Sequence, residues 1–121
     1  MQISEAESAV MEVLWRGPSP MTSEDVVAAL MATHDWQEPT IKTLLNRLLN
    51  KGAISAEREG RRYRYFPELK REDWLSDESD SLLYRLFGGR VAPLVAHFSE
   101  QRKLSKKDIA ELRKLIEELD A

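Results

Sequence analysis

The chain has 121 residues, contains no cysteine and has only two histidines, His34 and His97. Without cysteine it can form neither a disulfide framework nor a thiolate metal site. The two histidines are far apart in sequence and lack the spacing of metal ligands. We therefore expect no metal and no other cofactor. The absence of disulfide chemistry fits a reducing, cytoplasmic location.

Long apolar runs and enzymatic signatures are also missing. No stretch has the length that a membrane span needs, and the N-terminus lacks the basic and apolar segments of a signal peptide. The sequence contains no glycine-rich phosphate loop, no nucleophile-elbow pattern and no metal-ligand cluster. Asp77, Glu78 and Asp80 are more simply a solvated helix face than a catalytic carboxylate group. We expect neither an enzyme nor a membrane partner.

Charge is unevenly distributed along the chain. The net charge of −3 would, taken alone, argue against a nucleic-acid partner. Residues 1–39 carry one basic and seven acidic residues, and residues 67–121 carry ten basic and twelve acidic residues. Residues 40–66, however, carry seven basic and two acidic residues, a net of +5. Positive charge concentrated in one segment indicates contact with phosphates.

A helix is predicted from Pro39 to Lys51, ending at Gly52. Its apolar residues recur at i, i+3, i+4, i+7 and i+8 and form one stripe: Ile41, Leu44, Leu45, Leu48 and Leu49. At about 100° per residue, the opposite face carries Thr40, Thr43, Asn46, Arg47 and Asn50. These side chains offer hydrogen-bonding groups and no carboxylate. We predict that this face follows a groove of DNA.

A basic β-hairpin is predicted directly after this helix. Its strands are Ile54–Arg58 and Arg61–Phe66, joined by a turn at Glu59-Gly60. Its basic residues are Arg58, Arg61, Arg62 and Arg64. Such a hairpin could simply be a charged edge that resists aggregation, but its place after a groove-reading helix favours DNA contact. Tyr63 and Tyr65 fall on one face of the hairpin, and we expect them to pack against the helices rather than stack on bases.

Two further helices precede the groove-reading one. Ser4 and Glu7 have the form of a capping box at the start of the first, and Thr22 takes the corresponding place in the second. The second and third helices, joined by the polar connection Thr33–Glu38, form a helix-turn-helix that the first helix backs. With the hairpin as its wing, residues 1–69 are predicted to be a winged-helix DNA-binding domain.

Residues 70–121 are predicted to form three short amphipathic helices. The first ends at Gly88-Gly89, and the last begins at the capping pair Ser105 and Asp108. Apolar residues at helical spacing are Leu82, Leu86, Phe87, Leu94, Val95, Phe98, Ile109, Leu112, Ile116 and Leu119. Three short amphipathic helices of roughly fifty residues in total make a thin core by themselves. We expect a second copy of the chain to cover these faces; the alternative is that they fold back onto the N-terminal domain.

The predicted fold is therefore mainly α with a small β-hairpin wing: an N-terminal winged helix-turn-helix and a C-terminal helical dimerisation region. Several stretches also resemble the BlaI/MecI family of β-lactamase and methicillin-resistance repressors, which includes the copper repressor CopY. They include Ile3–Glu7, Val10–Trp15, Thr40–Leu48, Arg58–Arg61 and Leu86–Gly89. The resemblance covers nearly the whole chain. It implies a homodimeric repressor that binds inverted-repeat, palindromic operators in double-stranded DNA overlapping the promoters of the genes it controls.

The sequence departs from this family in two places. CopY-type members carry paired Cys-x-Cys motifs that hold copper or zinc, and this chain has no cysteine. Antibiotic-responsive members are inactivated by proteolysis at an asparagine–phenylalanine bond, which corresponds here to His97-Phe98. The phenylalanine is present and the asparagine is not. The resemblance therefore gives His97 and Phe98 as a candidate cleavage position, and a regulatory protease as a candidate partner, without predicting the same proteolytic route.

The predicted helix-turn-helix assigns roles to individual side chains. In the major groove, Arg47 could offer a bidentate contact to guanine, Asn46 could pair with adenine, and the Thr43 methyl group could contact thymine. The residues expected to hold phosphates and set the register are Thr40, Lys42 and Asn50. The four hairpin arginines would hold the backbone or reach the adjacent minor groove. The alternative function is a winged-helix protein-interaction module, but the helix face offers none of the apolar anchors that such a surface needs.

Overall fold

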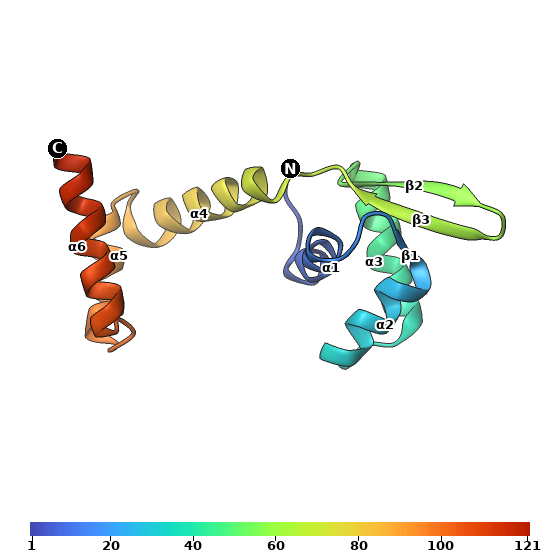
Figure 1. Cartoon of the computed structure of the whole chain (residues 1–121), viewed down its shortest axis with the longest axis horizontal. Helices are drawn as coiled ribbons and strands as arrows, with labels where there is room; N and C mark the ends of the chain where they lie inside the picture. The colour runs from blue at the N-terminus through green and yellow to red at the C-terminus, as the bar shows by residue number, and fades with distance from the viewer. The chain divides into compact units, whose positions relative to one another are not determined.

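The computed structural model describes residues 1–121, which divide into two compact units, Met1–Leu75 and Ser76–Ala121. The elements of the first unit are α1 (Glu5–Arg16), β1 (Met21–Thr22), α2 (Ser23–Thr33), α3 (Glu38–Lys51), β2 (Ile54–Glu59) and β3 (Arg62–Pro67) (Figure 1). Helix α4 (Arg71–Phe87) begins in the first unit and continues into the second. The second unit also holds α5 (Val91–Glu100) and α6 (Lys106–Asp120). None of these helices combines the length and the apolar character required to cross a bilayer.

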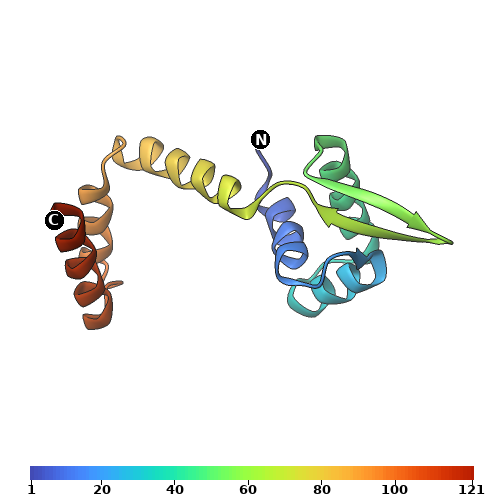
Figure 2. The same ribbon diagram turned by 45° about the horizontal axis from the view of Figure 1, so that its top comes forward.

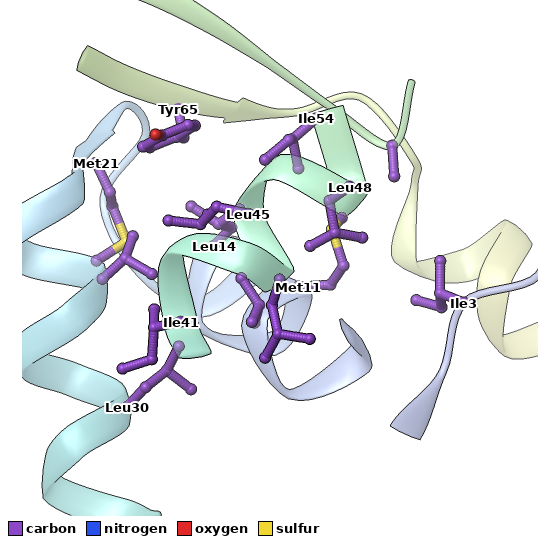
Figure 3. Close-up of a cluster of buried hydrophobic side chains, with 14 residues drawn as sticks. Ile3, Met11, Leu14, Met21, Leu30, Ile41, Leu45, Leu48, Ile54 and Tyr65 are labelled. Carbon is purple, nitrogen blue, oxygen red and sulfur yellow. The ribbon is translucent and has the colours of Figure 1, made fainter. Parts of the chain in front are cut away.

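The hydrophobic core lies in the first unit, where side chains from α1, α2, α3 and the sheet meet (Figure 3). The largest fully buried side chains are Met11, Leu14, Leu30, Ile41, Leu45, Leu48, Val10 and Val26. The apolar stripe predicted for α3 is confirmed, because four of its five residues are buried and Leu49 is half-buried. Gly52 ends the helix with φ of +77°, a conformation that favours glycine. Burial of this stripe leaves the opposite face of α3 at the surface.

A three-stranded antiparallel sheet forms one side of this unit, with strand order β1-β3-β2. The predicted hairpin is confirmed, but its turn lies at Gly60-Arg61, one residue later than expected. The third strand, β1, was not predicted, because two residues carry no readable pattern. It pairs Met21 with Tyr65 and Thr22 with Arg64. Strand β1 therefore ties the start of α2 to the base of the hairpin, whose turn extends beyond the helices (Figures 1 and 2).

An ion pair joins α1 to the C-terminal end of α3. Lys51 Nζ lies 2.7 Å from Glu7 Oε1, and the Glu7 side chain is only 3% exposed. The same oxygen accepts a hydrogen bond from the Ser4 amide at 2.9 Å, completing the predicted capping box. Burial raises the pKa of the Glu7 carboxyl, but the Lys51 ammonium and the Ser4 amide and hydroxyl outweigh it, so the pKa is lowered. The charged form of Glu7 therefore stabilises the fold.

We expect the stability of the domain to depend on pH through Glu7. Because its folded-state pKa lies below the ordinary value of 4.5, its contribution is complete above that value and is lost as the pH falls through the folded-state pKa. Glu7→Gln should lower the free energy of unfolding by about 1–3 kcal/mol at pH 7. Urea unfolding between about pH 7 and pH 3 should show the difference shrinking on acidification. If the difference in free energy of unfolding between the wild type and Glu7→Gln is the same at every pH, Glu7 does not have this role. Glu5→Gln is the control, because Glu5 lies in the same turn and is exposed.

The first turn of α4 packs on α1. The rings of Trp15 and Trp74 lie with centroids 5.4 Å apart, and Trp15 Nε1 donates a hydrogen bond to the Leu69 carbonyl oxygen at 2.9 Å. Arg71 Nε lies 3.1 Å from Glu12 Oε1. Because of these contacts, the compact first unit ends at Leu75, six residues beyond the boundary expected from the sequence.

The second unit has no buried side chain of its own. Helix α4 ends at Gly88-Gly89, where both glycines have positive φ, as the sequence predicted for the end of this helix. Helices α5 and α6 lie side by side (Figures 1 and 2), and α6 begins at the predicted capping box of Ser105 and Asp108. The helices are well formed, yet they enclose no core.

Candidate nucleic-acid interface

Six of the ten side chains that the sequence assigned to DNA lie on α3, and all six are exposed: Thr40, Lys42, Thr43, Asn46, Arg47 and Asn50. Lys42 pairs with Glu38 one turn earlier at 3.1 Å. The Thr43 hydroxyl donates to the Pro39 carbonyl oxygen at 2.9 Å, which leaves its methyl group as the part available to a ligand. Arg47 forms no ion pair. The face thus offers a free guanidinium and two free amides.

Lys51 contributes to the positive segment of the sequence but is used inside the fold. Its ammonium donates to Glu7 and, at 3.2 Å, to the Gln2 carbonyl oxygen. The carboxylate partner lies 44 residues away in the chain, so no local pattern could have revealed the pairing. Lys51 holds the N-terminal segment against α3 and is not a free cation on the outer face.

The strand register divides the side chains of the hairpin between two faces. Ala56 lies opposite Tyr65, and Arg58 lies opposite Tyr63. Directly opposed residues share a face, and Tyr65 is buried in the core. We call the side with Arg58, Tyr63 and Tyr65 the inner face of the hairpin. In Figure 3 Tyr65 lies close to Leu45 of α3, so the inner face is the one turned toward α3.

The outer face of the hairpin carries as many acidic as basic side chains. Arg64 lies opposite Glu57, and Arg62 lies opposite Glu59. Arg64 Nε is also 2.7 Å from a carboxylate oxygen of Glu59. The two remaining arginines lie elsewhere: Arg58 on the inner face and Arg61 in the turn. The sequence assigned one role to all four arginines, whereas the structure places them in different electrostatic surroundings.

The prediction for the two tyrosines is confirmed for Tyr65 and wrong for Tyr63. Tyr65 is buried, whereas Tyr63 is 47% exposed, because the hairpin at this level has passed the edge of the helices. Burial raises the pKa of Tyr65, while the nearby charge of Lys42 acts in the opposite direction. Alternation along a strand identifies a face, but it does not show where the core beneath that face ends.

In the second unit, the predicted interface residues are half-buried or exposed. The half-buried ones are Phe87, Leu94, Val95 and Leu112, and the exposed ones are Leu82, Leu86, Phe98, Ile109, Ile116 and Leu119. An open groove of about 390 Å³ lies between α4 and α5, lined by Leu82, Leu83, Val91 and Leu94 among others. His97 and Phe98, the candidate cleavage position, are both exposed near the end of α5. The apolar stripes predicted from the sequence thus lie at the surface.

Comparison with known proteins identifies the family of the chain. The family model described as Penicillinase repressor matches residues 3–118. The penicillinase repressor of Bacillus licheniformis is 39% identical over 117 residues, which are 97% of this chain and 91% of that protein. The solution structure of the DNA-binding domain of the repressor BlaI is 40% identical, covers 60% of this chain and 87% of that chain, and has a TM-score of 0.55.

A second solved structure is Bacillus licheniformis BlaI in its monomeric form in complex with the blaP half-operator. It is 40% identical, covers 60% of this chain and 88% of that chain, and has a TM-score of 0.54. These matches confirm the resemblance that the sequence suggested and the winged-helix fold of the first unit. The chain belongs to the penicillinase repressor family.

Proposed function

We propose that this protein is a DNA-binding transcriptional repressor, located in the cytoplasm, that acts as a homodimer on an inverted-repeat operator. One observation carries the proposal: α3 buries its apolar stripe and exposes a face of hydroxyl, amide and guanidinium groups beside a basic hairpin. A structure with a similar winged-helix domain, that of Bacillus licheniformis BlaI, is a complex with the blaP half-operator. A bound dimer would repress by blocking access of polymerase to the promoter.

In this proposal α3 enters the major groove. Arg47, Asn46 and Thr43 would contact base edges, because a guanidinium can pair bidentately with guanine, a carboxamide with adenine, and a methyl group can contact thymine. The side chains proposed to hold phosphates are Thr40, Lys42 and Asn50. The hairpin would act as the wing along the neighbouring backbone, and its candidate cations for that contact are Arg58, Arg61, Arg62 and Arg64.

The N-terminus of α2 is a weaker candidate for a phosphate contact. The Thr22 hydroxyl already accepts the Asp25 amide at 3.2 Å. Glu24 and Asp25 lie in the first turn and are exposed. Their charges satisfy the positive end of the helix dipole and would repel a phosphate. We therefore assign backbone contacts to α3 and the wing.

A second copy of the chain is the proposed partner of residues 70–121. The second unit buries no side chain, and its helices cannot be stabilised by their own contacts alone because most of their apolar area remains in water. The proposed interface residues are Leu82, Leu86, Phe87, Leu94, Val95, Phe98, Ile109, Leu112, Ile116 and Leu119. Two-fold symmetry would then require two half-sites on one face of the duplex, separated by about one helical turn or a multiple of it.

The bond between His97 and Phe98 remains the proposed position for regulatory cleavage. Both residues are exposed, but they belong to the hydrogen-bonded part of α5. A protease that binds its substrate in an extended conformation would require this end of α5 to unwind first. Cleavage there would separate α6 from the rest of the interface and would weaken the dimer.

The proposal is tested by binding the purified full chain to a pool of random duplexes at two salt concentrations and sequencing the retained molecules. We expect an inverted repeat to be enriched. A dimer carries two copies of the basic segment, so log affinity should fall with log salt with a slope on the order of −6 to −10. No enrichment, together with weak binding at both salt concentrations, would reject the proposal and favour a protein-interaction module.

A further inference from the structure

The hairpin contains more positive charge than negative, and the strand register shows where the excess lies. Between Ile54 and Pro67 there are four arginines and two glutamates. The outer face holds two arginines opposite two glutamates, so its charge balances. The net charge of the hairpin therefore comes entirely from Arg58 on the inner face and Arg61 in the turn.

Arg64 is also restrained in a way that Arg58 is not. Its Nε is 2.7 Å from Glu59, and contact with a phosphate would require this pair to separate or would place a carboxylate next to the phosphate. Arg58 Nε donates instead to the Gly60 carbonyl oxygen at 3.0 Å, a neutral acceptor in the adjacent turn. Its charge therefore has no counter-ion within the hairpin.

Tyr63 lies directly opposite Arg58 and keeps nearly half of its surface in water. A tyrosine in this position combines a hydroxyl that can donate to a phosphate oxygen with a ring that can pack on a deoxyribose. Neither side-chain hydrogen bond of the hairpin, from Ser55 to Glu68 and from Arg58 to Gly60, uses the Tyr63 hydroxyl, so this hydroxyl is available to a ligand. Tyr63 and Arg58 adjoin the buried part of the inner face, where Tyr65 lies close to Leu45 of α3 (Figure 3).

We infer that the wing contacts the DNA backbone through its inner face, by Tyr63 and Arg58, and not through Arg62 and Arg64. The inference rests on the proposed repressor function and specifies which surface of the wing meets the operator. The inner face is the side of the hairpin that is turned toward α3 (Figure 3), so one strand of DNA could follow both elements. Glu57 and Glu59 balance the outer face and keep it from attracting DNA on the wrong side of the hairpin.

The test compares single variants of the full chain on the duplex selected by the wild-type protein and on a non-cognate duplex of the same length. We expect Arg58→Ala and Tyr63→Ala each to lower affinity about 5- to 20-fold on both duplexes. Arg58→Ala should also reduce the salt slope by about one for each half-site. Arg64→Ala changes the charge of the outer face by one unit but removes no proposed contact, so it should lower affinity by less than fivefold and leave the salt slope nearly unchanged. Tyr63→Phe keeps the ring and removes only the hydroxyl, so its affinity should lie between those of the wild type and Tyr63→Ala.

The acidic residues give a second, opposite expectation. Glu59→Gln releases Arg64 from its ion pair and should raise affinity for the non-cognate duplex about two- to fivefold, because the outer face then carries net positive charge. If Arg64→Ala lowers affinity and salt slope as much as Arg58→Ala does, or if Tyr63→Ala binds like the wild type, the inference is wrong. If the wild-type chain itself retains no duplex, the proposed function fails instead. Unchanged unfolding midpoints would show that these exposed substitutions leave the fold intact.

Discussion

Replacing Ile116 with aspartate is expected to convert the proposed dimer into monomers and to lower affinity for the selected inverted repeat by about 100-fold or more. Ile116 lies in the middle of the apolar stripe of α6 and is 58% exposed in the single chain. A substitution at such a position normally changes the stability of a monomer by less than about 0.5 kcal/mol. A large effect would therefore show that another chain covers the residue.

The loss of affinity follows from linkage between two binding events. In a dimer, binding of one winged-helix unit brings the second unit to its half-site at a high effective concentration. An aspartate on each side of the two-fold axis would place unpaired charges in an apolar interface, which is strongly destabilising. The monomer would still bind a single half-site weakly, as expected of a unit whose core lies entirely within residues 3–65.

Sedimentation and duplex binding measure the two parts of this prediction separately. Ala110→Asp is the matched control, because Ala110 is exposed on α6 and lies at about 150° from the centre of the apolar stripe at 100° per residue. It introduces the same charge and should leave both assembly and binding unchanged. If Ile116→Asp sediments and binds as the wild type does, the stripe of α6 is not the dimer interface.

Most of the first unit could be predicted because its signals are local and repeated. The stripe of α3, the capping pairs and Gly52 each specify an element from residues within a few positions of one another. Strand β1 could not be predicted, since it consists of two residues that become a strand only by pairing with β3. The sheet therefore has one strand more than the pattern of the sequence shows.

The sequence located the segment that forms the candidate site more accurately than it identified the individual residues available to DNA. The exposed face of α3 follows from helical geometry alone, but the surroundings of each cation depend on distant residues. Lys51 is held by Glu7 of α1, and Arg64 is held by Glu59 across the hairpin. Counting positive charges along the sequence treats these residues as equal to Arg47 and Arg58. Only the tertiary structure and the strand register separate cations that stabilise the fold from cations that remain available.

Arg47 is the residue whose loss should most alter sequence recognition. Its guanidinium is exposed and unpaired, and the planar fork that it presents matches the two acceptors of guanine in the major groove. Arg47→Ala should cost about 1–3 kcal/mol for each half-site on the selected duplex. It should also relax the preference at one base position in each half-site, and repeating the selection with the variant measures that change.

Two further substitutions separate base reading from simple attraction to phosphate. Arg47→Lys keeps the charge but replaces the fork with a single ammonium, so it should retain non-specific binding and lose most of the discrimination. Lys42→Ala, in contrast, should weaken all duplexes alike and reduce the salt slope, because Lys42 is assigned to the backbone. If Arg47→Ala lowers specific and non-specific affinity by the same factor, Arg47 holds a phosphate. Base recognition would then depend on Asn46 and Thr43, the remaining side chains on this face with groups suited to base edges.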